Sequence, residues 1–396
     1  MQNLLTPQNI LPQDHAQAVL IGRIWVDGLG PTLVRVCQDH IYDISGVAPT
    51  CTQLLELDDP AAAVRASDAP RIADTAEVLA NSVLEQRTAG KPWFLAPCDL
   101  QAIKAAGVTF VASMLERVIE EQARGDAGRA EAVRRSVVSV IGDNLRSVRP
   151  GSAQAAQLRD VLIGQGVWSQ YLEVGIGEDA EIFTKSQPMS AVGVGAEIGL
   201  HPKSVWNNPE PEVVLAVNSR GETQGCALGN DVNLRDFEGR SALLLGKAKD
   251  NNASAAIGPF IRLFDPRFGI DDVRRCELAM RVTSADGTFE MHGSSSLSMI
   301  SRDPLELVEQ AIGEAGQRTH QYPDGFMLYL GTMFAPTQDR FKPGQGFTHA
   351  MGDVVSVSAA GLGMLVNRVN LSDRVAPWNY GAAALMRDLA RRGLLA

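Results

Sequence analysis

The sequence lacks the features that insert a protein into a membrane. No stretch approaches about 18 uninterrupted apolar residues, the length that a membrane-spanning helix needs. The N-terminal stretch MQNLLTPQNILPQDHAQ has neither a basic start nor an apolar run, so no secretory signal is expected. We therefore expect a cytoplasmic protein without a membrane partner.

Cysteine and excess positive charge are also scarce. The five cysteines are scattered and include no Cys-x-x-Cys pair, which favours reduced thiols over disulfides or a thiolate zinc site. The 36 basic residues are outnumbered by 46 acidic ones, for a net charge of −10. This charge disfavours nucleic acid as a partner, because phosphate binding requires a basic surface. A glycine-rich loop of the dinucleotide-binding pattern is missing as well.

What the sequence does contain is a mixture of strand and helix patterns. Residues 18–46 alternate apolar and polar residues around glycine-containing turns, which predicts a small antiparallel β unit. A helical apolar period follows near residues 111–119, with Glu120 and Glu121 expected outside the apolar stripe. Further helices are predicted at about residues 130–141 and 153–163.

The chain changes character after the predicted helices. From Trp168 onward, many short strand patterns are separated by Gly, Asn, Asp and Pro. We predict an α+β protein in which a small N-terminal domain of helices and strands over residues 1–150 precedes a larger mixed-β catalytic domain over residues 165–396.

A β-hairpin is predicted in the second half of the chain. Residues 212–217 and 224–229 are β-rich apolar runs joined by a polar turn centred near Arg220 and Gly221. With this turn, residue i faces residue 441 − i on the other strand. The register therefore determines which side chains meet at the open end of the hairpin.

Three carboxylates are expected to meet there. Glu210 lies opposite Asp231, and Glu212, which shares a strand face with Glu210, lies opposite Gly229. Asp231 is then a cross-strand neighbour at about 5 Å. A divalent cation would remove the repulsion, and this hard oxygen set suits Mg²⁺ or Mn²⁺. The alternative is a solvated acidic strand edge.

The residues around this hairpin resemble the fumarylacetoacetate hydrolase family. Over about residues 168–370, its motifs occur in order and spacing as Glu210-Pro-Glu212, Asn230-Asp231-Val-Asn-Leu-Arg235-Asp236, Ala248-Lys249, Gly258-Pro259 and Leu330-Gly331-Thr332. The runs WNNPEPEVVL, LGNDVNLRDFEGRSALLL, KAKDNNAS, GTMFAP and GQGFTH are more closely similar to bacterial 2-keto-3-deoxy-pentonate dehydratases within it. The resemblance implies a mixed β-roll fold, a Mg²⁺ site and a homodimer or homotetramer.

The resemblance also implies roles for individual residues. It places the metal ligands at Glu210, Glu212 and Asp231 and the active-site lysine at Lys249. It places substrate contacts at Lys185, Arg235, Gly331 and Thr332. Arg235 paired with Asp236 or another acid for structural reasons is an alternative. A further candidate comes from the Ser294-Ser295-Ser296 loop, where Ser296 would contact sugar-acid oxygens unless the loop is simply a solvated turn.

Two departures from the hydrolases of this family bear on the reaction. Glu238 stands where similar hydrolases have glutamine, and residues 168–181 contain no histidine where those enzymes have a water-activating one. The means of activating a hydrolytic water is therefore missing.

These features lead to the hypothesis of a Mg²⁺-dependent dehydratase. Its substrate would be a 2-keto-3-deoxy-pentonate of the xylonate or arabinonate type, and its product 2,5-dioxopentanoate, as in non-phosphorylative pentose catabolism. Lys249 and Glu238 are the candidates for proton transfer. Lys249 could instead stay charged and bind the substrate carboxylate, and Glu238 could instead pair with Arg235 or Arg240.

Two other functions remain open from the sequence. One is a metal-dependent hydrolase that splits a C–C bond of an acylpyruvate or a 2,4-diketo-3-deoxy sugar acid. The other is a non-catalytic binding or scaffold subunit, against which the retained acidic ligands and Lys249 argue.

Overall fold

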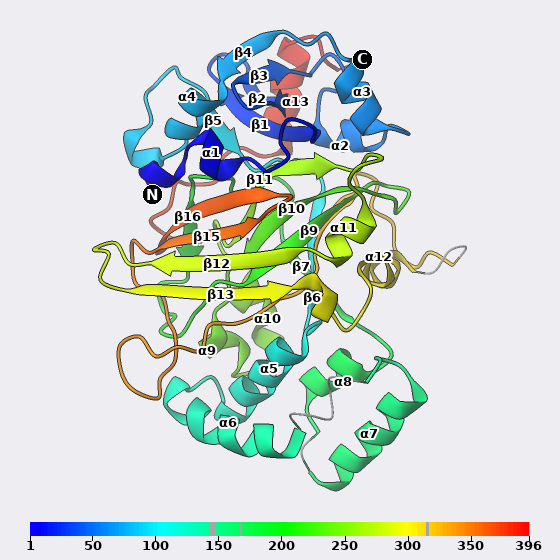
Figure 1. The fold of residues 1–396 in the computed structure, drawn as a ribbon, viewed down its shortest axis with the longest axis vertical. Helices are drawn as coiled ribbons and strands as arrows, with labels where there is room; N and C mark the ends of the chain where they lie inside the picture. The colour runs from blue at the N-terminus through cyan, green and yellow to red at the C-terminus, as the bar shows by residue number, and fades with distance from the viewer. Residues whose placement is uncertain (142–147, 167, 314–316, 396) are drawn as a thin grey trace.

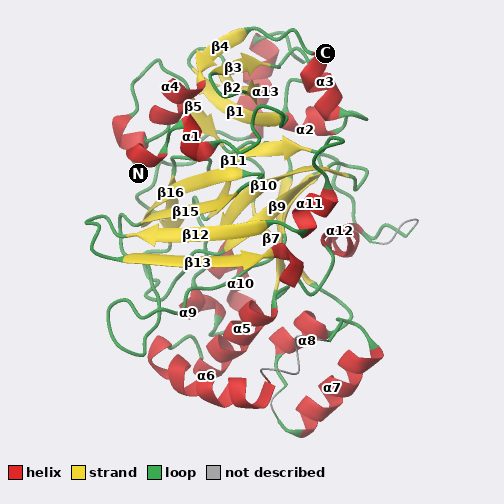
Figure 2. Ribbon diagram, viewed as in Figure 1, coloured by secondary structure: helices red, strands yellow, loops and turns green. Residues whose placement is uncertain are grey.

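The computed structural model describes residues 1–141, 148–166, 168–313 and 317–395. Two β-sheets run through the middle and upper parts of Figure 1, with helices around the upper strands and a second group of helices below the sheets. Figure 2 shows strands in the middle layers and a group of helices at the lower end. The α+β class is confirmed. Within the described residues, no helix has the length and apolarity to cross a membrane.

Among the described residues, the larger sheet has eleven strands. Their order along the sheet is β4 (Arg71–Asp74), β3 (His40–Asp43), β2 (Gly30–Val36), β1 (Leu20–Val26), β11 (Ala255–Leu263), β10 (Thr223–Asp231), β9 (Pro211–Val217), β14 (Phe326–Tyr329), β6 (Ala102–Gly107) and β7 (Glu181–Ser186), with β5 (Trp93–Leu95) paired to β1. The β14–β6 pair is parallel and its neighbours are antiparallel, so the sheet is mixed.

The smaller sheet has five strands in the part of the chain that the structure describes. Their order is β13 (Glu290–Ser296), β12 (Glu277–Thr283), β15 (Val354–Ala359), β16 (Gly363–Leu371) and β8 (Glu197–Leu200). This sheet packs on the β9–β11 part of the larger one, and both contribute to one buried apolar cluster that includes Leu215, Leu228, Val282, Val357 and Leu365. Burial of this shared core fixes the hairpin strands between two layers.

The helices are short or moderate in length. They are α1 (Pro7–Ile10), α2 (Cys51–Leu55), α3 (Pro60–Ala66), α4 (Thr75–Ala80), α5 (Val111–Ala123), α6 (Ala127–Ile141), α7 (Ala153–Gly164), α8 (Gln170–Ile176), α9 (Arg235–Glu238), α10 (Leu245–Lys249), α11 (Ile270–Arg274), α12 (Pro304–Ile312) and α13 (Ala382–Arg391). Helices α5 to α8 form the lower group in Figure 1, and α5 packs against α6, α8 and α9. The three helices expected between residues 111 and 163 are confirmed.

The N-terminal strands continue the sheet that carries the hairpin. The β unit predicted at residues 18–46 forms β1, β2 and β3, and β1 pairs with β11 through Leu20↔Arg262 and Ile21↔Ile261. Helix α13, near the C-terminus, packs on β2. Strands from both sides of the predicted division at residues 150–165 therefore share one sheet, and the division itself stays a prediction.

Candidate metal centre and active site

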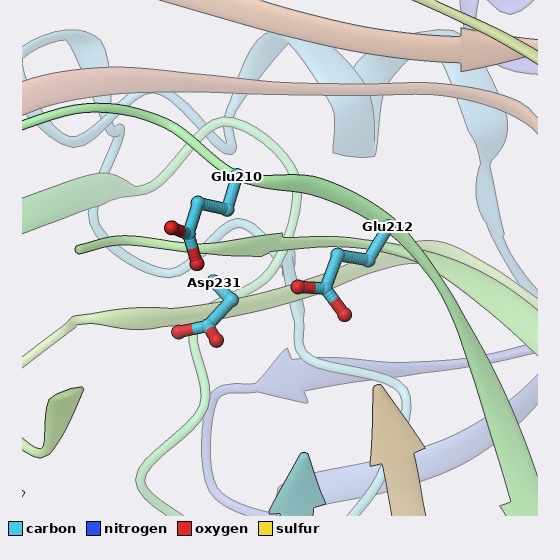
Figure 3. Close-up of side chains that lie close together, drawn as sticks. All are labelled: Glu210, Glu212 and Asp231. Atoms are coloured by element: carbon cyan, nitrogen blue, oxygen red, sulfur yellow. The ribbon is translucent and has the colours of Figure 1, made fainter. Parts of the chain in front are cut away.

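The open end of the β9–β10 hairpin brings three carboxylates together. Gly229 pairs with Glu212, and the Asp231 amide donates to the Glu210 carbonyl at 2.9 Å. One carboxylate oxygen from each of Glu210, Glu212 and Asp231 lies within 4.8 Å of the others (Figure 3). Each residue is at most 2% exposed. The predicted register is confirmed, and the acidic strand edge is buried rather than solvated.

The hairpin needs glycine opposite Glu212. A Cβ on Gly229 would lie 2.4 Å from Tyr329 Cε1 and 2.5 Å from Val214 Cγ2, closer than real Cβ contacts. The ring of Tyr329 occupies this space, and its hydroxyl donates to the Ala256 carbonyl at 2.7 Å. Glycine at this position of β10 therefore leaves space for the buried Tyr329 ring.

The three acids differ in their electrostatic surroundings. Burial and the negative charges of Asp231 and Glu210 raise the pKa of Glu212 well above its ordinary range. Burial would also raise the pKa of Glu210, but the positive charges of Arg117 and Lys249 outweigh it and lower that pKa to about 2. Glu212 therefore holds a proton more readily than Glu210.

Two buried lysines contact the acids. Lys249 Nζ lies 2.5 Å from Glu210 Oε2 and 3.0 Å from Asp231 Oδ2. Burial alone would lower the pKa of Lys249, but Asp231, Glu210 and Glu238 raise it. Lys185 Nζ lies 2.8 Å from Asp231 Oδ1 and also donates to the carbonyls of Val232, at 3.1 Å, and Lys249. Lys185 thus ties β7 to the end of β10 and to α10.

The segment after β14 supports Glu212. The Gly331 amide donates to Glu212 Oε2 at 2.7 Å, and the Thr332 hydroxyl donates to Oε1 at 3.3 Å. Gly331 has φ +102°, and a Cβ there would lie 1.9 Å from Thr109 Oγ1. Glycine is therefore required both by backbone conformation and by space. In this structure, Gly331 and Thr332 hold a candidate metal ligand.

Arg117 and Glu238 complete the buried cluster. The Arg117 guanidinium contacts Glu210 through Nη2, and its Nη1 lies 2.8 Å from Glu238 Oε2. Burial is the main cause that raises the pKa of Glu238 to about 7. Glu238 Oε2 is buried without a hydrogen bond, so its contact with Arg117 has the distance of an ion pair but not the alignment of a hydrogen bond. Sequence reasoning identified Glu238 and missed Arg117.

Comparison with known proteins gives relatives for part of the chain. No protein-family model matches it. Over 199 residues, it is 30% identical to a probable 2-keto-3-deoxyxylonate dehydratase from Haloferax volcanii, covering 50% of this chain and 63% of that protein. Over 189 residues, it is 28% identical to a 2-dehydro-3-deoxy-D-arabinonate dehydratase from Saccharolobus solfataricus, covering 48% and 58%. The match thus spans less than two thirds of either relative.

Solved structures cover most of the chain. A 2-keto-3-deoxy-D-arabinonate dehydratase complexed with magnesium and 2,5-dioxopentanoate matches with a TM-score of 0.60 and 18% identity, covering 89% of this chain and 99% of that one. A fumarylacetoacetate hydrolase from Exiguobacterium antarcticum matches with a TM-score of 0.54 and 17% identity, covering 89% and 100%. The chain has the fumarylacetoacetate hydrolase fold. At these identities the likeness establishes the fold and no more, and the predicted fold is confirmed.

In this fumarylacetoacetate hydrolase fold, the Arg235 guanidinium binds protein groups, whereas the resemblance implies that it binds substrate. Its Nε donates to Glu120 at 2.6 Å, its Nη2 to Glu116 at 2.9 Å and its Nη1 to the Pro336 carbonyl at 3.2 Å. The guanidinium also stacks on Trp206, 4.6 Å from the ring centroid. Each guanidinium nitrogen already has a protein partner, so the structural alternative describes this geometry, and a substrate contact would require rearrangement.

Glu120, which was expected outside the apolar stripe of α5, is buried. Glu120 is 1% exposed and receives hydrogen bonds from Arg117 at 2.7 Å and from Arg235. Because Glu120 pairs with Arg117 and Arg235 inside the protein, a charged side chain of α5 is buried. The sequence of α5 alone does not reveal this pairing. Glu121, the other residue of the pair, accepts hydrogen bonds from Ser169 and Gln170.

Ser296 was predicted as a site residue and Glu181 was not. The Ser296 hydroxyl contacts Ser298 Oγ at 2.7 Å and caps the 3₁₀ helix Leu297–Met299, so its sugar-binding role stays a prediction without a contact that supports it. Glu181, which sequence reasoning passed over, begins β7 opposite Gly107. Burial raises its pKa, and the charges of Arg117, Lys249, Glu210 and Asp231 also act on it. Glu181 is thus a second titratable carboxyl beside the cluster.

The donor set fits a hard divalent cation. Three buried carboxylates supply oxygen ligands of the kind that Mg²⁺ and Mn²⁺ prefer. Asp231 Oδ1 is buried without a hydrogen bond, although Lys185 Nζ is near enough for an ion pair. A cation at this position would satisfy that oxygen and neutralise the repulsion that raises the pKa of Glu212.

Proposed function

We propose that this chain is a divalent-metal-dependent dehydratase that converts a 2-keto-3-deoxy-pentonate into 2,5-dioxopentanoate. The observation that carries the proposal is the buried trio of Glu210, Glu212 and Asp231, with titratable carboxyls and a lysine beside it. The names of the two sequence relatives support the same substrate class. Mg²⁺ held by the trio would stabilise negative charge on the substrate's 2-keto and carboxylate oxygens.

The protein groups must then move protons. In our proposal, the Glu238 carboxylate takes a proton from C3, and the C4 hydroxyl leaves as water after it gains a proton. Glu238 suits the role of base because burial brings its pKa to about 7. The enone that results is converted to the aldehyde by loss of a C5 proton, proton gain at C3, and tautomerisation of the C4–C5 enol. Glu181, a half-buried carboxyl on which the charges of Glu210 and Asp231 act, is the second candidate for these transfers.

Lys249 takes the charged role in this proposal. Its ammonium lies against Glu210 and Asp231, and those charges raise its pKa. A lysine held as a cation is a poor base, which favours the alternative in which Lys249 stays charged. It is better suited to attract the substrate carboxylate or to protonate the departing hydroxyl.

The test is product analysis with purified protein. Incubation with Mg²⁺ and 2-keto-3-deoxy-xylonate or 2-keto-3-deoxy-arabinonate should give the aldehyde signal of 2,5-dioxopentanoate by ¹H NMR, and EDTA should abolish it. Absence of that product, together with pyruvate release from an acylpyruvate, would establish the hydrolase alternative instead. Turnover of neither substrate by protein that binds Mg²⁺ would favour a binding subunit.

Two wider predictions belong to the same proposal. The resemblance implies a homodimer or homotetramer, and the sequence favours a cytoplasmic location. Light scattering coupled to size-exclusion chromatography would measure the oligomeric state. Fractionation of the source cells would determine the location.

A further inference from the structure

One buried guanidinium touches both a candidate metal ligand and the candidate base. Arg117 Nη2 contacts Glu210 Oε1, while Nη1 lies 2.8 Å from Glu238 Oε2. Arg117 is 7% exposed and comes from α5, far in sequence from both acids. Glu210, which directly precedes β9, and Glu238 of α9 are therefore connected through a residue of α5.

Arg117 is also held by an acid of its own helix. Its Nη1 donates to Glu120 at 2.7 Å, and Glu120 also accepts from Arg235 Nε at 2.6 Å. Glu116, one turn earlier in α5, accepts from Arg235 at 2.9 Å and from Arg134 at 2.7 Å. The Arg117 guanidinium is thus held by Glu120, which belongs to an ion-pair network of α5, α6 and α9.

The shape of arginine suits this two-sided contact. A guanidinium is planar and presents its donors in a rigid fork, whereas the ammonium of lysine is a compact point charge. A fork can hold two carboxylates in a defined relation. A lysine at the same position would keep the charge but would lack a second donor group at a fixed angle to the first.

We propose that Arg117 is a positioning residue that fixes Glu210 relative to Glu238, so that the metal ligand and the base keep the spacing the reaction needs. The inference rests on the proposed metal site. It differs from the simpler idea that Arg117 is only a counter-ion that competes with the dication for Glu210. The two ideas predict opposite effects on metal affinity when Arg117 is replaced.

The experiment compares Mn²⁺ binding by calorimetry in Arg117→Gln, Arg117→Lys and wild-type protein. A positioning role predicts weaker binding in Arg117→Gln by about 10- to 100-fold, the usual effect of losing a group that orients a metal ligand. Arg117→Lys should also bind more weakly, because it retains charge without the fork. Arg262→Gln is the matched control, since Arg262 is also a buried arginine, its guanidinium donates to Asp14 and not to the cluster, and the variant should bind Mn²⁺ as the wild type does.

Unchanged or tighter Mn²⁺ binding in both Arg117 variants would overturn the inference, as would wild-type affinity in Arg117→Lys alone. If Arg117→Gln fails to fold, Arg117→Lys carries the test, and the Mn²⁺-induced increase in its Tm gives an independent readout. Failure of the wild-type protein to bind Mn²⁺ would instead overturn the metal site itself. Weak binding by the variants of a protein that lacks dehydratase activity would leave the positioning role standing and reject only the reaction.

Discussion

The β9–β10 hairpin carries acidic side chains at both ends, and their surroundings are opposite. At the turn, Glu222 is half exposed and accepts hydrogen bonds from Asn218 and Arg220, both at 2.8 Å. The hydrogen bond from Asn218 is the main cause that lowers the pKa of Glu222. At the open end, Glu212 is buried among like charges and its pKa is raised. The same strand pairing therefore produces a solvated loop at one end and a buried cluster of charged side chains at the other.

The partners of the two ends come from different distances along the chain. Glu222 is satisfied by residues within four positions of it. Glu210 is contacted by Arg117 and Lys249, from other elements of the fold. Only the tertiary structure forms the surroundings of Glu210. There the carboxylates are buried away from water, so a bound cation would stabilise their charge.

The largest difference between the two ends should appear in metal binding. Replacing both Glu210 and Glu212 with alanine removes two of three ligands, so Mn²⁺ binding should fall below detection by calorimetry. The matched control is Glu222→Ala, which removes a carboxylate from the same hairpin at the turn and should bind Mn²⁺ normally. Unchanged binding in the double variant would refute the ligand assignment.

Removal of the candidate base should have the next largest effect. Glu238→Gln should lower kcat by about 10²- to 10⁴-fold, the range for loss of a general acid or base. Its raised pKa means that the carboxylate becomes abundant only above about pH 7, so wild-type kcat should rise with pH through that value. Mn²⁺ affinity should be kept. A variant that retains wild-type kcat and the same acid limb would remove Glu238 from the mechanism.

Burial of the Glu212 carboxylate should lower the stability of the protein when metal is removed. The raised pKa of Glu212 means that the folded state binds its proton more tightly than the unfolded chain, so stability falls as pH rises above the ordinary value of 4.5. Glu212→Gln should therefore raise the free energy of unfolding at pH 8 by about 1–3 kcal/mol, on the scale of an uncompensated buried polar group.

Urea denaturation in EDTA measures this difference. At pH 4 the wild-type carboxyl is protonated in the folded state, and the two proteins should be nearly equal in stability. Added Mn²⁺ should reverse the order at pH 8, because only the wild type keeps all three ligands. A Gln variant that is less stable than wild type at pH 8 without metal would contradict this account of the charge cluster.

The turn end should show the smallest effect. Arg220→Ala removes exposed ion pairs with Glu222 and Glu56, so the free energy of unfolding should fall by only about 0–1 kcal/mol. Metal affinity should not change. A loss of several kcal/mol, or of Mn²⁺ binding, would mean that the two ends of the hairpin are coupled.

The sequence was sufficient for the parts of the site that depend on local pairing. Alternation of side chains and a turn near Arg220 and Gly221 determine that Glu212 faces Gly229 and that Asp231 lies beside Glu210. The β unit at residues 18–46 and the helix of α5 were predictable from period for the same reason.

The sequence was insufficient where contacts join distant elements. Nothing in the spacing of α5 reveals that Arg117 reaches Glu210 or that Glu120 is buried beneath Arg235. Arg235 was assigned by resemblance to the substrate, whereas Glu116 and Glu120 occupy its guanidinium. Buried ion pairs of this kind depend on three-dimensional packing, for which a single sequence carries no periodic signal.

The most direct test of the central claim is anomalous diffraction from a crystal of the protein grown with Mn²⁺. We predict one strong peak per chain among Glu210, Glu212 and Asp231, about 2.0–2.2 Å from an oxygen of each. A chain whose three carboxylates turn away from one another, with Mn²⁺ elsewhere or nowhere, would contradict the claim.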